Sequence, residues 1–115
     1  MRIRVRAGLL ALAAGALPVA VVAAPAAAVA ADRAQTHQVA IQGLLYVPET
    51  LTVRPGDVVV WTNRDPFPHT VTAKGQFDSG SIGVDRRWTL VARKAGHYAY
   101  LCTLHPNMQG SVDIE

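Results

Sequence analysis

One short loop near the C-terminus collects three side chains that could bind a metal. Within "YLCTLHPNMQG" (residues 100–110), Cys102 is the single cysteine of the chain, and His105 and Met108 follow it at intervals of three. A thiolate, an imidazole and a thioether on one tight loop can converge on a point. On a continuing strand they could not, because side chains there alternate between the two faces. The spacing therefore favours a metal site over a buried structural thiol.

A fourth ligand has to come from elsewhere in the chain, and His69 is the best candidate. It follows the loop "DPFP" (residues 65–68), where strand-like alternation resumes. Two imidazoles and a thiolate form a trigonal set, a methionine sulfur adds a weak axial contact, and this combination suits copper in both the Cu(I) and Cu(II) states. Zinc also binds Cys and His but rarely recruits methionine. We therefore expect one copper ion to be held by His69, Cys102, His105 and Met108.

Catalytic chemistries fit the sequence less well. The four histidines of the chain cannot supply the further histidine-rich sites of multicopper oxidases or nitrite reductases. A cysteine hydrolase is disfavoured because His105 lies too close to Cys102 to act as a separately oriented base. The pattern thus predicts a protein that is not an enzyme. The other histidines and the tryptophans are interpreted as surface and core residues respectively: His37 and His97, then Trp61 and Trp88.

The first thirty residues have the order of a secretory signal peptide. "MRIRVR" is basic, residues 7–30 are apolar and alanine-rich, and Ala28-Val29-Ala30 has the small-x-small form of a cleavage site. The apolar run is long enough for an uncleaved membrane anchor, but its two prolines and many alanines favour cleavage. We expect export through this signal, with residues 1–30 removed and residues 31–115 forming one domain without stable membrane association.

The charge and the cysteine count narrow the function of that domain. The net charge of +3 comes from the three arginines of the basic start, which leaves eight basic and eight acidic residues in 31–115. Nucleic-acid binding is disfavoured because it needs a clustered positive face. A domain this small often needs a disulfide or a bound metal for its stability, and one cysteine cannot form an internal disulfide. A bound metal is the remaining common source of that stability.

The segments of the expected domain are short, rich in β-branched residues and separated by turn residues. "RPGD" (residues 54–57), for example, combines a proline and a glycine in positions typical of a turn. Seven or eight short strands at this spacing predict an all-β sandwich or barrel, with 58–63 as a central strand. The sequence does not decide between a loop and a short helical turn near residues 78–84. The expected strands are 37–42, 50–53, 58–63, 69–73, 87–92, 97–102 and 110–115.

Two long segments resemble the cupredoxins, the type 1 blue copper proteins, and in particular the amicyanin-like and plastocyanin-like members. "GDVVVWTNRDPFPHTV" (residues 56–71) resembles the segment around the first histidine ligand, and "GHYAYLCTLHPNMQGSVDIE" (residues 96–115) resembles the C-terminal ligand loop. The resemblance implies a Greek-key β-sandwich that binds one copper through the four residues named above. It also implies a one-electron carrier in the periplasm.

The resemblance further implies where redox partners dock. His105 would be the exposed ligand, through which a donor dehydrogenase and a c-type cytochrome acceptor exchange electrons in transient contacts. An apolar rim is expected around it, formed by Pro66, Phe67, Pro68, Pro106 and Asn107. The alternative function is copper trafficking, by a chaperone or store. That alternative predicts methionine and histidine clusters, whereas the chain has only two methionines, Met1 and Met108.

Two positions depart from the amicyanin pattern. Thr70 replaces an asparagine that ties the two ligand loops together, so either Thr70 bonds more weakly, to Thr103, or the link is lost. Leu104 replaces a proline and keeps its backbone N–H, which could donate to the Cys102 sulfur. We hypothesise that such a donor would raise the reduction potential, because it withdraws charge from the thiolate.

Overall fold

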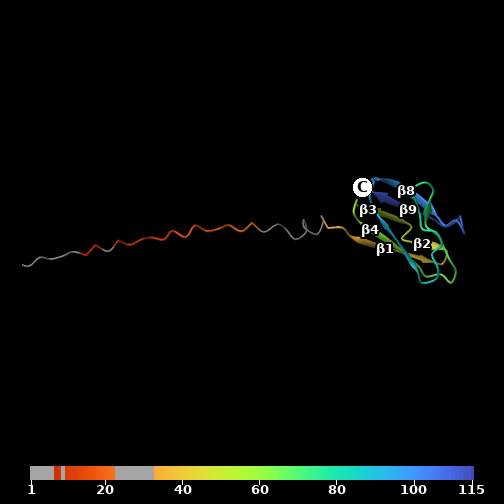
Figure 1. The fold of residues 1–115 in the computed structure, drawn as a ribbon, viewed down its shortest axis with the longest axis horizontal. Helices are drawn as coiled ribbons and strands as arrows, with labels where there is room; N and C mark the ends of the chain where they lie inside the picture. The colour runs from red at the N-terminus through yellow and green to blue at the C-terminus, as the bar shows by residue number, and fades with distance from the viewer. Residues whose placement is uncertain (1–6, 9, 23–32) are drawn as a thin grey trace, which may run out of the picture.

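In a computed structural model, residues 33–115 form a two-sheet β-sandwich (Figure 1). The structure describes residues 7–8, 10–22 and 33–115. Residues 7–8 and 10–22 are exposed and belong to no helix or strand. In the part of the chain that the structure describes, no helix has the length and apolarity needed to cross a membrane. The predicted cleavage site at 28–30 and the basic start lie outside the described residues.

The first sheet is built around the strand that the sequence marked as central. Its order is β2-β1-β4-β7, and β4 therefore lies in its interior. β1 runs parallel to β4, with Val39 opposite Trp61, while β2 and β7 pair antiparallel to their neighbours. The strands are β1 (Thr36–Gln42), β2 (Leu45–Val47), β4 (Val58–Asn63) and β7 (Arg87–Val91).

The second sheet carries the C-terminal ligand loop. Its order is β3-β9-β8-β5-β6, with β3 parallel to β9 and the other neighbours antiparallel. The adjacent strands β8 and β9 are the two arms of that loop, so its ends are held close together. The strands are β3 (Thr50–Val53), β5 (Thr72–Ala73), β6 (Phe77–Asp78), β8 (Gly96–Leu101) and β9 (Gln109–Ile114).

An aromatic cluster fills the space between the sheets. Trp61 is fully buried, and its ring lies 5.5 Å from those of both Tyr100 and Trp88. The Trp61 indole N–H donates to the Tyr100 hydroxyl at 3.2 Å, which satisfies the buried polar end of each side chain. Trp88 is half-buried and packs against the core. Trp61 thus has the core role expected from the sequence, and Trp88 lies at the margin of the core.

The predicted all-β sandwich is confirmed, with nine strands instead of seven or eight. The sequence missed β2 and β6 because strands of three and two residues are too short to show a period. The strand expected over 69–73 is shorter, because His69 makes only an isolated bridge with Ile82 before β5 begins. Residues 78–84 contain no helical turn.

Candidate metal centre

The loop that carries His69 is organised by a buried asparagine. Asn63, at the end of β4, has no exposed surface. Its amide group donates to the carbonyls of Phe67, at 2.9 Å, and Ile82, at 3.0 Å. Its carbonyl oxygen accepts from the Asp65 N–H at 2.9 Å. These three hydrogen bonds fold the loop back on itself and direct the His69 side chain into the sandwich.

Both nitrogens of the buried His69 ring have neighbours. Nδ1 lies 3.6 Å from the Cys102 sulfur, and Nε2 lies 2.7 Å from an oxygen of Asp65. The same carboxylate accepts the backbone N–H groups of Gly43, at 2.7 Å, and Leu44, at 3.0 Å. Burial opposes ionisation of Asp65, but the hydrogen bonds from Leu44, Gly43 and His69 outweigh it and hold the pKa of this carboxyl below its usual value.

The C-terminal ligand loop is closed by its own backbone. Cys102 directly follows β8, and Met108 directly precedes β9. The Cys102 N–H donates to the Met108 carbonyl at 3.1 Å. Within the loop, the His105 N–H donates to the Cys102 carbonyl at 3.3 Å, and the Met108 N–H to the His105 carbonyl at 2.9 Å. The spacing of three residues between successive predicted ligands therefore corresponds to two consecutive hydrogen-bonded turns.

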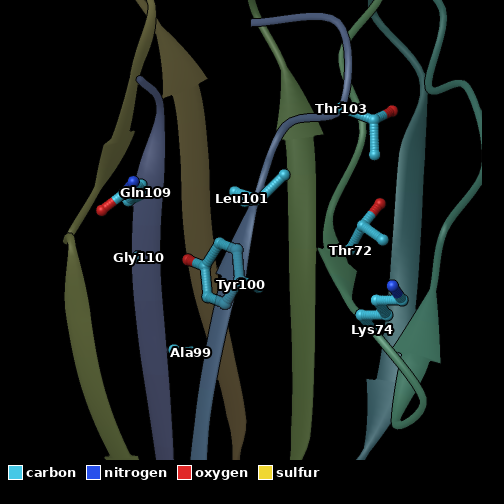
Figure 2. A pocket seen from close by; sticks show the side chains of 8 residues that line it. All are labelled: Thr72, Lys74, Ala99, Tyr100, Leu101, Thr103, Gln109 and Gly110. Carbon is cyan, nitrogen blue, oxygen red and sulfur yellow. The ribbon is translucent and has the colours of Figure 1, made fainter. Parts of the chain in front are cut away.

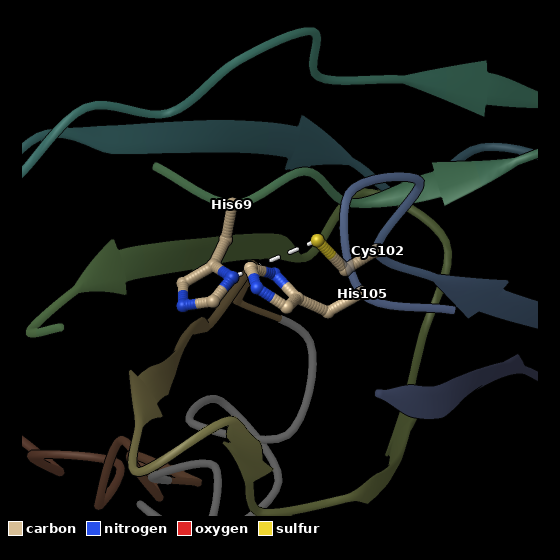
Figure 3. Close-up of side chains that lie close together, drawn as sticks. All are labelled: His69, Cys102 and His105. Carbon is tan, nitrogen blue, oxygen red and sulfur yellow. Dashed lines mark hydrogen bonds between the residues drawn. The ribbon is translucent and has the colours of Figure 1, made fainter. Parts of the chain in front are cut away.

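The structure brings three of the four predicted ligands together. Donor atoms of His69, Cys102 and His105 all lie within 4.8 Å of one another, and Figure 3 shows the two rings and the sulfur directed into one space. The His105 Nδ1 is buried and has no hydrogen-bond partner among the described residues. Buried polar atoms are nearly always satisfied, so an unpartnered imidazole nitrogen beside a thiol and a second imidazole fits a metal donor set. Met108 is buried at the end of the same loop.

The hydrogen bond to the Cys102 sulfur comes from a different residue than the sequence suggested. The Thr70 N–H donates to this sulfur at 3.3 Å. Between residues 33 and 115, no hydrogen bond joins the Leu104 N–H to it, so the donor role hypothesised for Leu104 is not met. Leu104 instead lies exposed at the surface. The Cys102 N–H bond to the Met108 carbonyl holds the ligand loop closed. The loop that carries His69 places the N–H of the following residue, Thr70, over the sulfur.

The link between the two ligand loops is present. The Thr103 N–H donates to Thr70 Oγ1 at 2.9 Å, and the two hydroxyl oxygens lie 3.2 Å apart. Thr70 Oγ1 also lies 3.0 Å from the Thr72 hydroxyl. Of the two outcomes left open by the sequence, the structure therefore shows that Thr70 bonds to Thr103.

The partly exposed side of the centre lies at His105. His69 and Cys102 have no exposed surface and Met108 has almost none, whereas His105 is half-buried. Phe67 is 39% exposed, and its ring lies 5.2 Å from the His69 ring and 5.7 Å from the His105 ring. The remaining rim residues named from the sequence are also exposed: Pro66, Pro68, Pro106 and Asn107.

Two open grooves of similar size lie near the C-terminal ligand loop. One, of about 670 Å³, is lined by His105 and Met108 together with exposed leucines, among them Leu44 and Leu104. The other, of about 690 Å³, runs along β8 and β9 past Thr103 and contains none of the four predicted ligands (Figure 2). Of these two grooves, only the first reaches predicted ligands.

The other two histidines are both paired with carboxylates. His97 is exposed, as expected, and its Nδ1 bonds to Asp113. His37, also expected at the surface, is half-buried: its side chain is 22% exposed, and its Nε2 lies 3.0 Å from Asp57. The parallel pairing of β1 with β4 places His37 over the start of β4, a contact between segments that the sequence does not show to be neighbours.

Sequence reasoning missed three residues that support the centre: Asn63, Asp65 and Tyr46. The Tyr46 hydroxyl donates to the Thr70 carbonyl, and burial, followed by the nearby Cys102, raises the pKa of this phenol well above its usual value. Asn63 and Asp65 resemble ordinary residues of a turn. The only sequence signal for Asp65 is its position four residues before His69, and that spacing alone does not indicate a hydrogen bond between the two side chains.

Comparison with known proteins identifies the class to which this fold and site belong. A family model described as the cupredoxin-like domain matches residues 11–113. The chain therefore belongs to the cupredoxin family, and the resemblance seen in the sequence is confirmed.

Amicyanins are prominent among the similar proteins. The amicyanin of Paracoccus denitrificans is 36% identical over 87 residues, and that of Paracoccus versutus is 32% identical over 83 residues. Each alignment covers 67% of this chain and 63% of the relative, so the chain spans just under two thirds of their length. A solved structure of a methionine-to-glutamine amicyanin variant with Cu(I) is 30% identical, with a TM-score of 0.67, covering 70% of this chain and 82% of that one.

Proposed function

We propose that this protein is a type 1 blue copper protein that carries single electrons between redox partners. Its ligands are His69, Cys102, His105 and Met108, and copper bound there supplies the Cu(I)/Cu(II) couple. The observation that carries the proposal is the convergence of the His69, Cys102 and His105 donor atoms within 4.8 Å, with His105 Nδ1 otherwise unpartnered. Thiolate with two imidazoles is the donor set of blue copper sites.

The surrounding chain suits electron transfer better than catalysis. Hydrogen bonds hold both ligand loops, so the ligands keep the same arrangement around Cu(I) and Cu(II). The buried Cys102 and His69 exclude water and substrate from one side of the site. No second cluster of metal-ligating groups occurs among the described residues. We therefore infer a carrier and not an enzyme.

The partly exposed His105 is the proposed route for electrons. The apolar surface around it, with Phe67 and Leu104, provides a docking site for a donor dehydrogenase and a c-type cytochrome acceptor in turn. A carrier must release each partner quickly, and small contact areas serve weak, transient encounters.

We place the protein in the periplasm, with residues 1–30 as a signal peptide and residues 31–115 as the copper-binding domain. The basis is the basic, apolar, small-residue order of the first thirty residues. Expression in a bacterial host with an exported fraction tests this. N-terminal sequencing of that fraction should begin at or near Ala31, and an uncut chain retained in the membrane would contradict cleavage.

Absorption and EPR spectra of the protein loaded with Cu(II) test the copper site. We expect an intense thiolate-to-copper charge-transfer band and a narrow copper hyperfine splitting. A colourless protein, or an ordinary tetragonal copper spectrum, would count against a blue site. Copper trafficking would then be the better explanation, since a store or chaperone needs exchangeable metal. Rapid loss of copper to a chelator would point the same way.

A further inference from the structure

One carboxylate connects a ligand histidine to a turn in a distant part of the chain. Asp65 is only 5% exposed, and it accepts hydrogen bonds from Gly43 N–H, Leu44 N–H and the His69 ring. Gly43 and Leu44 form the turn between β1 and β2, and both have a φ of 62°. Glycine adopts this left-handed region readily, whereas leucine rarely does. The two amides of this turn are thus both directed at Asp65, and the turn holds Leu44 in a conformation that leucine disfavours.

The carboxylate determines which nitrogen of His69 carries the proton. An ionised carboxylate only accepts hydrogen bonds, so Nε2 must donate to Asp65. The neutral ring then has a free lone pair on Nδ1, which lies 3.6 Å from the Cys102 sulfur. Without Asp65, the proton could occupy either ring nitrogen. In the tautomer protonated at Nδ1, the nitrogen nearest the sulfur would be unable to bind a metal.

We propose that Asp65 is the positioning residue of the metal centre: held by the Gly43–Leu44 turn, it fixes His69 with Nδ1 toward Cys102 and lowers the reduction potential. This inference rests on the proposed copper site. A negative charge hydrogen bonded to a ligand raises the basicity of that ligand. It therefore stabilises Cu(II) more than Cu(I), which lowers the potential.

The chain contains a matched control for this arrangement. Asp57 also accepts two backbone N–H groups, from Gln35 at 2.8 Å and Arg54 at 3.0 Å, and it also pairs with a histidine, His37. It lies before the start of β4, while Asp65 lies beyond its end. Six residues of strand separate them, a distance of about 20 Å. Loss of the Asp57 carboxylate should therefore leave the metal centre unchanged.

The test is the variant D65N compared with D57N. An amide keeps the shape of the carboxylate but offers one acceptor, so at least one of the three donors at position 65 faces an NH2 group. We expect D65N to bind Cu(II) about 10- to 100-fold more weakly. If Cu(I) affinity is unchanged, each tenfold loss raises the potential by about 59 mV, as cyclic voltammetry would show. D57N should lose stability without a change in potential.

A second measurement needs neither copper nor a stable variant. The ¹⁵N NMR spectrum of the metal-free wild-type protein, at a pH where free imidazole is neutral, reports the tautomer of His69. We expect a proton on Nε2 that exchanges slowly with water. A proton on Nδ1, or an equal mixture, would overturn the positioning role. A potential in D65N equal to or below that of the wild type would overturn the role in setting the potential.

These outcomes are distinguishable from failure of the proposed function. If the wild-type protein gave no blue-copper spectrum, the proposed function would be wrong. The NMR result would still decide whether Asp65 orients His69. If the wild-type protein is blue while D65N matches it in potential and in His69 tautomer, the inference about Asp65 alone fails.

Discussion

The backbone N–H of Thr103 and the side chain of Thr70 are hydrogen bonded at 2.9 Å. Each residue directly follows a proposed ligand in the sequence, His69 in one case and Cys102 in the other. The bond therefore ties together two loops that belong to different parts of the sandwich, at the point where both enter the metal centre. The Thr70 N–H strengthens this junction through its bond to the Cys102 sulfur.

Removing that link should loosen the centre without unfolding the domain. T70V keeps the side-chain shape but leaves the Thr103 N–H without its acceptor. We expect the free energy of unfolding of the metal-free protein to fall by about 1 kcal/mol in urea denaturation. T70S retains the hydroxyl and serves as the control. Equal stability of T70V and T70S would show that the link contributes nothing.

Substitution of Met108 separates its roles as a ligand and as a core residue. Leucine has a similar volume, so M108L should change the unfolding free energy of the metal-free protein by less than about 1.5 kcal/mol. The Cu(II) absorption and EPR spectra should nevertheless change, because the thioether is gone. If M108L leaves both spectra as in the wild type, Met108 is a packing residue and the copper site has three ligands.

Gly110 should be intolerant of any side chain. A Cβ at this position would lie 2.5 Å from the Tyr100 hydroxyl and 2.9 Å from the Glu49 carbonyl oxygen. We expect G110A to lower the free energy of unfolding by about 1–3 kcal/mol through overpacking, as measured in urea. G83A is the matched control, because the nearest atom to its Cβ would be 3.6 Å away. Similar stabilities of the two variants would contradict this packing.

The Asp57–His37 pair predicts an acid-sensitive contribution to stability. Hydrogen bonds from the Gln35 N–H, then from His37 and the Arg54 N–H, lower the pKa of Asp57 from 3.8 to about 2. The unfolded chain therefore binds this proton more readily, so the stabilisation is present above pH 3.8 and is lost as pH falls toward 2. In urea unfolding of the metal-free protein, D57N should show a weaker pH dependence across this window. An unchanged slope would mean that Asp57 titrates alike in both states.

Much of the fold and of the centre could be predicted because the signals were local. The strands Thr50–Val53 and Val58–Asn63 have the predicted bounds, since turn residues and β-branched runs determine them over a few positions. The spacing of Cys102, His105 and Met108 is likewise local, because it follows from successive turns of one loop. His69 was found through its place at the end of a proline-rich loop.

What the sequence could not provide depends on contacts between distant segments. Asp65 meets the Gly43–Leu44 turn only because β1 lies beside β4 in one sheet, and nothing local to either segment indicates it. The sequence offers the Leu104 N–H as a possible donor to the Cys102 sulfur, because leucine stands where the amicyanin pattern has proline. In the structure the donor is the Thr70 N–H, which is distant in sequence and near in space. The sequence by itself determined the residue types of the proposed ligands and most of the strand pattern. Only the tertiary structure decided which backbone amides and which carboxylate surround those ligands, because hydrogen bonds depend on the relative position of loops that different sheets hold in place.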